Sequence, residues 1–185
     1  KIAETVHRAG LPLIVDEAHG AHFHFGAIFP DSALDCGADV VIQSVHKTLP
    51  SLTQTSLLHA KFGKNGEELC RKIERYLALF QSSSPSYVLM ASIENAIYVM
   101  DALKKGEKIL GGSCTVEAYG RRLEDLRRSL SSMKNLRLAS RDLTGSCGIK
   151  DLDPSKIVIS TRETALSGED LMERLRERWS LELEM

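Results

Sequence analysis

The stretch LIVDEAHG at residues 13–20 carries an apolar run into an acid, and DVVIQSVHK at residues 39–47 carries another into a lysine. Runs that are apolar throughout are typical of strands buried on both faces of a parallel sheet. We therefore predict strands at 11–15 and 39–44. A helix before them, over 1–9, and a short one between them complete the alternation of an α/β domain.

The pattern of the remaining sequence predicts mostly helices up to residue 133, and short strands with one helix after it. Apolar spacing and turn signals predict the following elements: a short helix over 32–36, a strand over 56–60, helices over 67–81, 86–103 and 107–133, strands over 136–139, 156–160 and 181–185, and a helix that begins after Ser167. Ser167 precedes an acid by three residues, which is a capping signature. We place a domain boundary after residue 134, with 135–185 the start of a small α+β domain.

Composition excludes several classes of protein. The 185 residues are 43% hydrophobic and 26% charged, with a net charge of -1, so no overall field favours nucleic acid or an anionic membrane. The longest apolar stretches are too short to span a bilayer. The four cysteines form no C-x-x-C pair, which argues against structural zinc and predicts a reduced, cytoplasmic location. The chain starts inside a helix and stops inside an apparent strand, so we expect a fragment of a longer protein.

Asp16 and Lys47 predict a pyridoxal phosphate site. A lysine can hold this cofactor as an imine, and an acid at the end of a strand can keep its pyridine nitrogen protonated. Ala18 is small enough for the ring to approach the backbone, while Ser44 and His46 carry donors for the phosphate. By themselves, one aspartate and one lysine after strands are more commonly structural.

Longer motifs add a family resemblance. The segments at 15–23, at 37–49 and at 52–56 closely resemble the ornithine/lysine/arginine decarboxylases, and S-x-H-K-T-L followed by T-Q is specific to that group. The resemblance covers residues 1–135 most strongly. It implies a fold-type-I, aspartate aminotransferase-like major domain that ends at 134, followed by the beginning of the small domain.

The resemblance also implies roles for single residues. Lys47 matches the Schiff-base lysine, Asp16 the pyridinium partner and Ala18 the small residue against the ring, while Ser44 and His46 match residues near the phosphate. The stretch 82–86 lies where such dimers reach the neighbouring site. We expect decarboxylation of a basic amino acid by a homodimer or larger assembly, with neither nucleic acid nor membrane as partner. The phosphate-binding cup would lie before Lys1, so we expect the isolated chain to be inactive.

Other interpretations remain open. Residues 16–19 spell the helicase D-E-A-H box, but no P-loop occurs and the segment around Lys47 does not fit. The same residues resemble the oxoamine synthases, which have glycines after their lysine. We expect no metal site at His19, His22 and His24, although His19 could lie near the substrate. A non-catalytic fragment could use the basic helix face of residues 121, 122, 127 and 128 to bind an acidic partner.

Overall fold

The computed structural model describes residues 1–61, 66–109, 114–146 and 148–184. Its contacts divide the chain into two compact units. The first comprises Lys1–Ala27 and Asp31–Val116, and the second comprises Ile28–Pro30 and Glu117–Met185. These units are defined by packing, so the predicted domain boundary after residue 134 stays a prediction.

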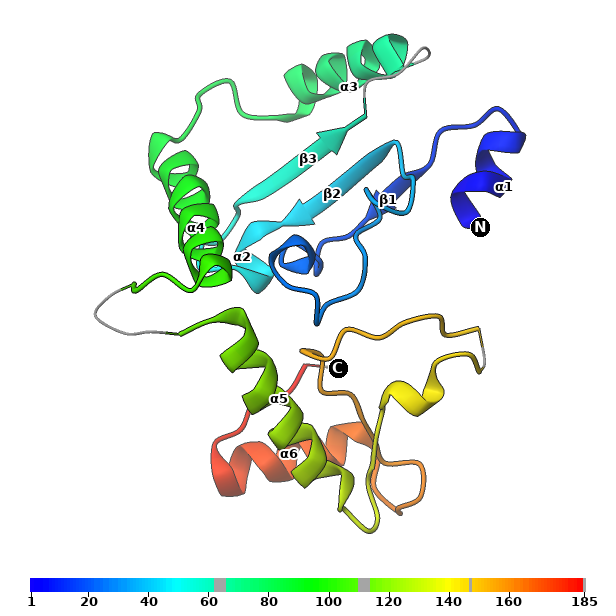
Figure 1. Ribbon diagram of the computed structural model, residues 1–185, viewed down its shortest axis with the longest axis vertical. Helices are drawn as coiled ribbons and strands as arrows, with labels where there is room; N and C mark the ends of the chain where they lie inside the picture. Colours follow the sequence, from blue (N-terminus) through cyan, green and yellow to red (C-terminus); the bar gives the residue numbers. More distant parts are fainter. Residues whose placement is uncertain (62–65, 110–113, 147, 185) are drawn as a thin grey trace. The chain divides into compact units, whose positions relative to one another are not determined.

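The first unit is built around a three-stranded sheet in the order β1-β2-β3 (Figure 1). β1 (Ile14–Asp16) and β2 (Val40–Ser44) are parallel, with Asp16 opposite Ile42, and β3 (Ser56–Ala60) is antiparallel to β2. The helical elements of this unit are α1 (Ile2–Arg8), η1 (Phe23–Phe25), α2 (Val45–Thr48), α3 (Gly66–Phe80) and α4 (Tyr87–Lys105). A mixed α/β architecture is therefore confirmed.

The core of the first unit lies where α2 meets α4. Val45 and Ala96 are fully buried there beside Ala21 and Leu49, and Leu57 from β3 packs against them. α4 is delimited by its own sequence: the Ser86 side chain accepts a hydrogen bond from the N–H of Leu89, and Gly106 ends the helix at φ 73°. This packing holds the short helix that follows β2, and hence Lys47, against the sheet.

The second unit is smaller. It contains α5 (Val116–Ser131), whose first residue belongs to the first unit, and then β4 (Arg137–Leu138), η2 (Arg141–Leu143), β5 (Ile159–Ser160) and α6 (Gly168–Trp179). β4 and β5 pair antiparallel. The predicted capping box is confirmed, because Ser167 and Asp170 exchange hydrogen bonds at the start of α6.

Several predicted elements differ in the structure. The helix predicted over 107–133 spans Val116–Ser131, and the strand predicted over 156–160 spans Ile159–Ser160. β1 begins at Ile14 rather than at residue 11, since Pro12 lacks an N–H and the Leu13 carbonyl accepts from the N–H groups of Asp39 and Val40. Residues 32–36 form turns instead of a helix. Residues 181–184 form no strand, because Ser180 adopts a left-handed conformation and the Leu181 N–H bonds back to Leu175.

Two observations bear on other predictions. In the described ranges, no helix is both long and apolar enough to cross a bilayer. Within the same ranges, no group of three or more histidine, cysteine, aspartate or glutamate side chains is placed to hold a metal ion.

Candidate active site

The C-terminal ends of β1 and β2 carry the residues that the sequence predicts for the site. β1 ends at Asp16, and β2 ends at Ser44 and continues directly into α2, which contains His46 and Lys47. Because parallel strands run in the same direction, the residues that follow them meet at one edge of the sheet. This is the edge at which open α/β sheets bind ligands.

Lys47 projects from α2 as an exposed side chain, and its Nζ lies 3.4 Å from Nε2 of His19. At such a contact one nitrogen donates and the other accepts, so the pair can hold a proton between them. His19 belongs to the D-E-A-H segment, so the contact joins the two sequence motifs. The position of His19 near the substrate stays a prediction.

Asp16, Ala18 and Ser44 are connected through the backbone. The carboxylate Oδ1 of Asp16, on an exposed side chain, accepts a hydrogen bond from the N–H of Ala18 at 3.0 Å. The carbonyl of Ala18 accepts from the N–H of Ser44 at 3.2 Å. The turn after β1 is therefore fixed against the end of β2, and the small side chain of Ala18 lies at this junction.

The two predicted phosphate-contacting residues are placed differently from each other. Ser44 is the N-cap of α2, but its side chain makes no capping hydrogen bond. Nδ1 of His46 lies 2.8 Å from the carbonyl of Thr55, and because a carbonyl only accepts, this nitrogen donates. Beside Lys47, the Thr48 hydroxyl is buried without a hydrogen-bond partner in the described chain.

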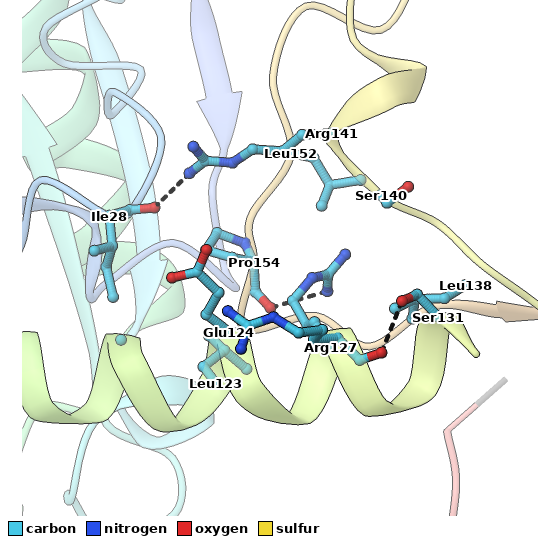
Figure 2. Close-up of a pocket in the computed structure, with 12 residues that line it drawn as sticks. Ile28, Leu123, Glu124, Arg127, Ser131, Leu138, Ser140, Arg141, Leu152 and Pro154 are labelled. Atoms are coloured by element: carbon cyan, nitrogen blue, oxygen red, sulfur yellow. Dashed lines mark hydrogen bonds between the residues drawn. The ribbon is translucent and has the colours of Figure 1, made fainter. Parts of the chain in front are cut away.

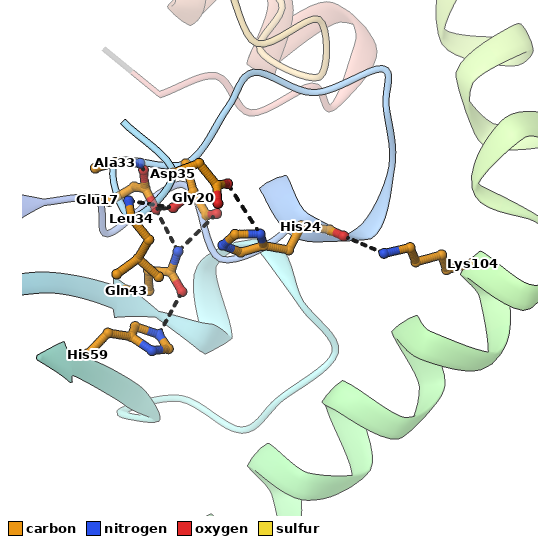
Figure 3. Close-up of polar contacts among 10 residues, drawn as sticks. Glu17, Gly20, His24, Ala33, Leu34, Asp35, Gln43, His59 and Lys104 are labelled. Atoms are coloured by element: carbon orange, nitrogen blue, oxygen red, sulfur yellow. Dashed lines mark hydrogen bonds and ion pairs between the residues drawn. The ribbon is translucent and has the colours of Figure 1, made fainter. Parts of the chain in front are cut away.

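A partly buried polar network behind this edge was not predicted from the sequence (Figure 3). Glu17 Oε2 accepts from Ser32 Oγ at 2.8 Å and from Gln43 Nε2 at 2.6 Å, and its Oε1 accepts from the N–H of Ala33 at 2.7 Å. Gln43 Oε1 contacts His59 Nε2 at 3.1 Å. The sequence feature that could have predicted this network is Gln43 inside the apolar run of β2, because a buried amide needs hydrogen-bond partners.

The other predicted positions lie elsewhere in the first unit. His22 is buried with its ring 4.8 Å from that of Phe23, and His24 pairs with Asp35 at 3.5 Å. Ser86, at the end of the stretch 82–86, caps α4. The roles assigned to these and to the five main site residues stay predictions.

A separate cavity of about 420 Å³ lies in the second unit (Figure 2). Its lining includes Arg127, Arg128 and Arg141 together with Glu124. Arg141 donates to the carbonyl of Ile28. None of the predicted site residues lines the cavity. Two of its three arginines, Arg127 and Arg141, donate hydrogen bonds to backbone carbonyls and so have a structural role.

An acid thus ends one of two adjacent parallel strands of an α/β sheet and a lysine follows the other, and comparison with known sequences specifies the family. The family described as "Orn/Lys/Arg decarboxylase, major domain" matches residues 1–168, and the chain belongs to it.

Individual relatives agree with the family match. The chain is 30% identical over its full length to the arginine decarboxylase of Bacillus cereus and 32% identical to that of Halalkalibacterium halodurans. Over 139 residues, or 73% of the chain, it is 40% identical to an uncharacterized protein of Bacillus subtilis, of which it covers 26%. The chain spans 38% and 35% of the two arginine decarboxylases.

Proposed function

We propose that the protein containing this chain is a pyridoxal-phosphate-dependent decarboxylase of a basic amino acid. The observation that carries the proposal is the exposed Lys47 amine at the end of β2, in contact with His19 of the D-E-A-H segment. Family membership supports the reaction class. The relatives named arginine decarboxylase make arginine the first substrate to test, with lysine and ornithine beside it.

The residues present fit this cofactor chemically. Lys47 supplies the primary amine that an aldehyde requires, and Asp16 supplies an accessible carboxylate for a protonated ring nitrogen. Ala18 leaves room beside the backbone, and the side chain of Ser44 is not used in capping.

The residues then have separate tasks. Bound pyridoxal phosphate supplies an electron sink for the carbanion left when carbon dioxide departs. Lys47 would hold the cofactor through its side-chain amine. Asp16 would keep the ring nitrogen protonated, and His19, with Nε2 3.4 Å from Lys47 Nζ, would exchange a proton with the Lys47 amine. Ser44 and His46 orient the phosphate.

The proposal extends to the architecture of the whole protein. We place residues 1–134 in the C-terminal part of an aspartate aminotransferase-like major domain and 135–185 at the beginning of a small α+β domain. The stretch 82–86 reaches the neighbouring site of a homodimer or larger assembly. In this proposal the whole protein is cytoplasmic, and its small-molecule partner is the amino-acid substrate.

The test uses the complete protein that contains this chain, loaded with pyridoxal phosphate. Borohydride reduction followed by peptide mass spectrometry should place the label on Lys47, and Lys47→Ala should abolish both label and carbon dioxide release. Asp16→Asn should lower kcat by about 10²–10³-fold, as for loss of another positioned electrostatic group. Lys72→Ala, which removes an exposed lysine paired with Glu68 on α3, is the matched control.

Two outcomes would contradict the proposal. A label on a different lysine, with Lys47→Ala still active, would remove Lys47 from the chemistry. Only a twofold effect of Asp16→Asn would remove the acid from its role at the ring nitrogen.

A further inference from the structure

The network behind the candidate site connects the two strands that carry it. Glu17 directly follows Asp16 at the end of β1, and Gln43 directly precedes Ser44 at the end of β2. Successive residues of a strand point to opposite faces. Glu17 and Gln43 can therefore bond to each other on one face while Asp16 is directed to the other.

The surroundings of Glu17 allow one arrangement of donors and acceptors. Its carboxylate accepts from the Ala33 N–H, the Ser32 hydroxyl and the Gln43 amide, and each of these three is a donor. Because a carboxylate only accepts, the NH₂ group of Gln43 must face Glu17, and that group also approaches the Gly20 carbonyl at 3.4 Å. Oε1 of Gln43 must then face His59, whose Nε2 has to donate.

Burial supports a neutral His59 in this position. Burial lowers the pKa of His59 below its ordinary value, and His24 lowers it further, while Glu17 acts in the opposite direction. The network requires a proton on Nε2, and in the neutral imidazole that burial favours, this places the single proton on Nε2 rather than on Nδ1. Gln43 and Ser32 are 4% and 1% exposed, so an unmatched donor here could not turn to water.

We propose that Glu17 and Gln43 form a positioning clamp, in which a charged hydrogen bond fixes the end of β1 against the end of β2 and so sets Asp16 relative to Lys47. The proposal rests on the proposed function. Neither residue touches the cofactor; they act through their chain neighbours Asp16 and Ser44. The short β1, with three residues in register with β2, has few backbone bonds of its own to do this.

Exchanging the two side chains tests the clamp. In Glu17→Gln, the NH₂ group of the new glutamine would face another donor, either the Ala33 N–H or the Gln43 NH₂ group. The conflict with Gln43 is relieved only if the Gln43 amide rotates by 180° and presents its oxygen. In Gln43→Glu, two carboxylates face each other at hydrogen-bond distance. The double variant restores an amide against a carboxylate with the direction of the bond reversed.

The measurements use the complete protein that contains this chain. The first is the dissociation constant for pyridoxal phosphate, followed by absorbance. Each single variant should weaken binding by roughly tenfold or more, because a buried hydrogen bond to a charged group is lost. The double variant should bind more tightly than either single variant. Asp35→Asn is the control, since it removes the pairing of His24 on the same loop and should change binding by less than about twofold.

The second measurement needs no cofactor. Nitrogen NMR of the cofactor-free protein should show His59 protonated on Nε2 in the wild type. In Glu17→Gln, where Gln43 turns over, the proton should move to Nδ1. The double variant should keep it on Nε2, because Glu at position 43 again accepts.

The outcomes separate the clamp from the function. Equal losses in all three variants, or wild-type binding by Glu17→Gln with His59 unchanged, would overturn the clamp. If the wild-type protein fails to bind pyridoxal phosphate while the His59 proton follows the predicted pattern, the proposed function fails and the network itself stands.

Discussion

At the scale of single residues, the D-E-A-H-G segment is explained by one close approach. A Cβ atom added at Gly20 would lie 2.4 Å from Cγ of Glu17 and 2.8 Å from Cε2 of Phe23. Real side chains do not come so near, so position 20 requires glycine for Glu17 to fold back and reach Gln43. The first acid of the segment faces the candidate site, and the second, with the glycine, supports it.

We expect Gly20→Ala to lower the free energy of unfolding by about 1–3 kcal/mol, the cost of forcing extra volume into a packed site. Urea denaturation measures it. In a Glu17→Ala background Cγ is absent, so the same substitution should cost clearly less. An equal cost in both backgrounds would show that Glu17 does not dictate the glycine.

At the scale of secondary structure elements, α5 illustrates how a charged side chain can be structural. The sequence assigned Arg127 and Arg128 to one basic outer face. For Arg127 that interpretation is wrong: its guanidinium is half-buried and donates to the carbonyls of Ala139, Pro154 and Lys156. Arg128 is exposed and pairs with Asp125 at 3.2 Å. Arg127 thereby connects α5 to both ends of the segment that joins β4 to β5.

Arg127→Met should destabilise the second unit by roughly 2–4 kcal/mol, because three carbonyls lose their donors while the side-chain stem is kept. Hydrogen exchange at the N–H of Ala139, which bonds to Val158, reports this unit directly. Arg128→Met is the matched control and should change stability by less than about 0.5 kcal/mol. Similar effects of the two substitutions would refute the structural role of Arg127.

At the scale of the whole molecule, Asp39 unites parts of the first unit that are far apart in sequence. Its Oδ2 accepts from the N–H of Leu13 at 2.7 Å and lies 2.8 Å from Nε2 of His7 in α1. Burial raises the pKa of Asp39, but the bonds from Leu13 and His7, with the charges of His7 and Lys61, outweigh it and hold the pKa below its usual value. One carboxylate thus fixes α1 and the starts of β1 and β2.

The pH dependence of stability follows from that lowered pKa. The folded state favours the charged form, so the stabilisation is complete above the unfolded pKa of about 3.9 and is lost as pH falls through the lower folded value. Asp39→Asn should be less stable at pH 7, and the difference from wild type should shrink below about pH 4. Urea denaturation across this range measures it, with the exposed Asp31→Asn as control. If the difference in the free energy of unfolding between the two proteins did not change with pH, the charge of Asp39 would not be the source of the stabilisation.

Local patterns in the sequence were sufficient for most of the strands and helices. The apolar run into Asp16, the capping residues Ser86 and Ser167, and the glycine that ends α4 depend on neighbours a few positions away, so they can be read along the chain. The predicted helix over 32–36 does not extend beyond one turn: the Cys36 N–H bonds to the Ser32 carbonyl, and the Ser32 hydroxyl and the Ala33 N–H at the start of the turn bond to Glu17.

What the sequence by itself determined is most of the strands and helices and the choice of Asp16 and Lys47 as candidate site residues, because periodicity, caps and short motifs are local. Only the tertiary structure decided which polar groups meet: His19 with Lys47, Glu17 with Gln43, Asp39 with His7 and Arg127 with three carbonyls. These contacts join residues 12 to 32 positions apart. Burial selects the partners of Gln43 and Arg127, because an enclosed donor must find an acceptor, whereas the exposed pairs His19–Lys47 and His7–Asp39 meet because the fold brings their segments together.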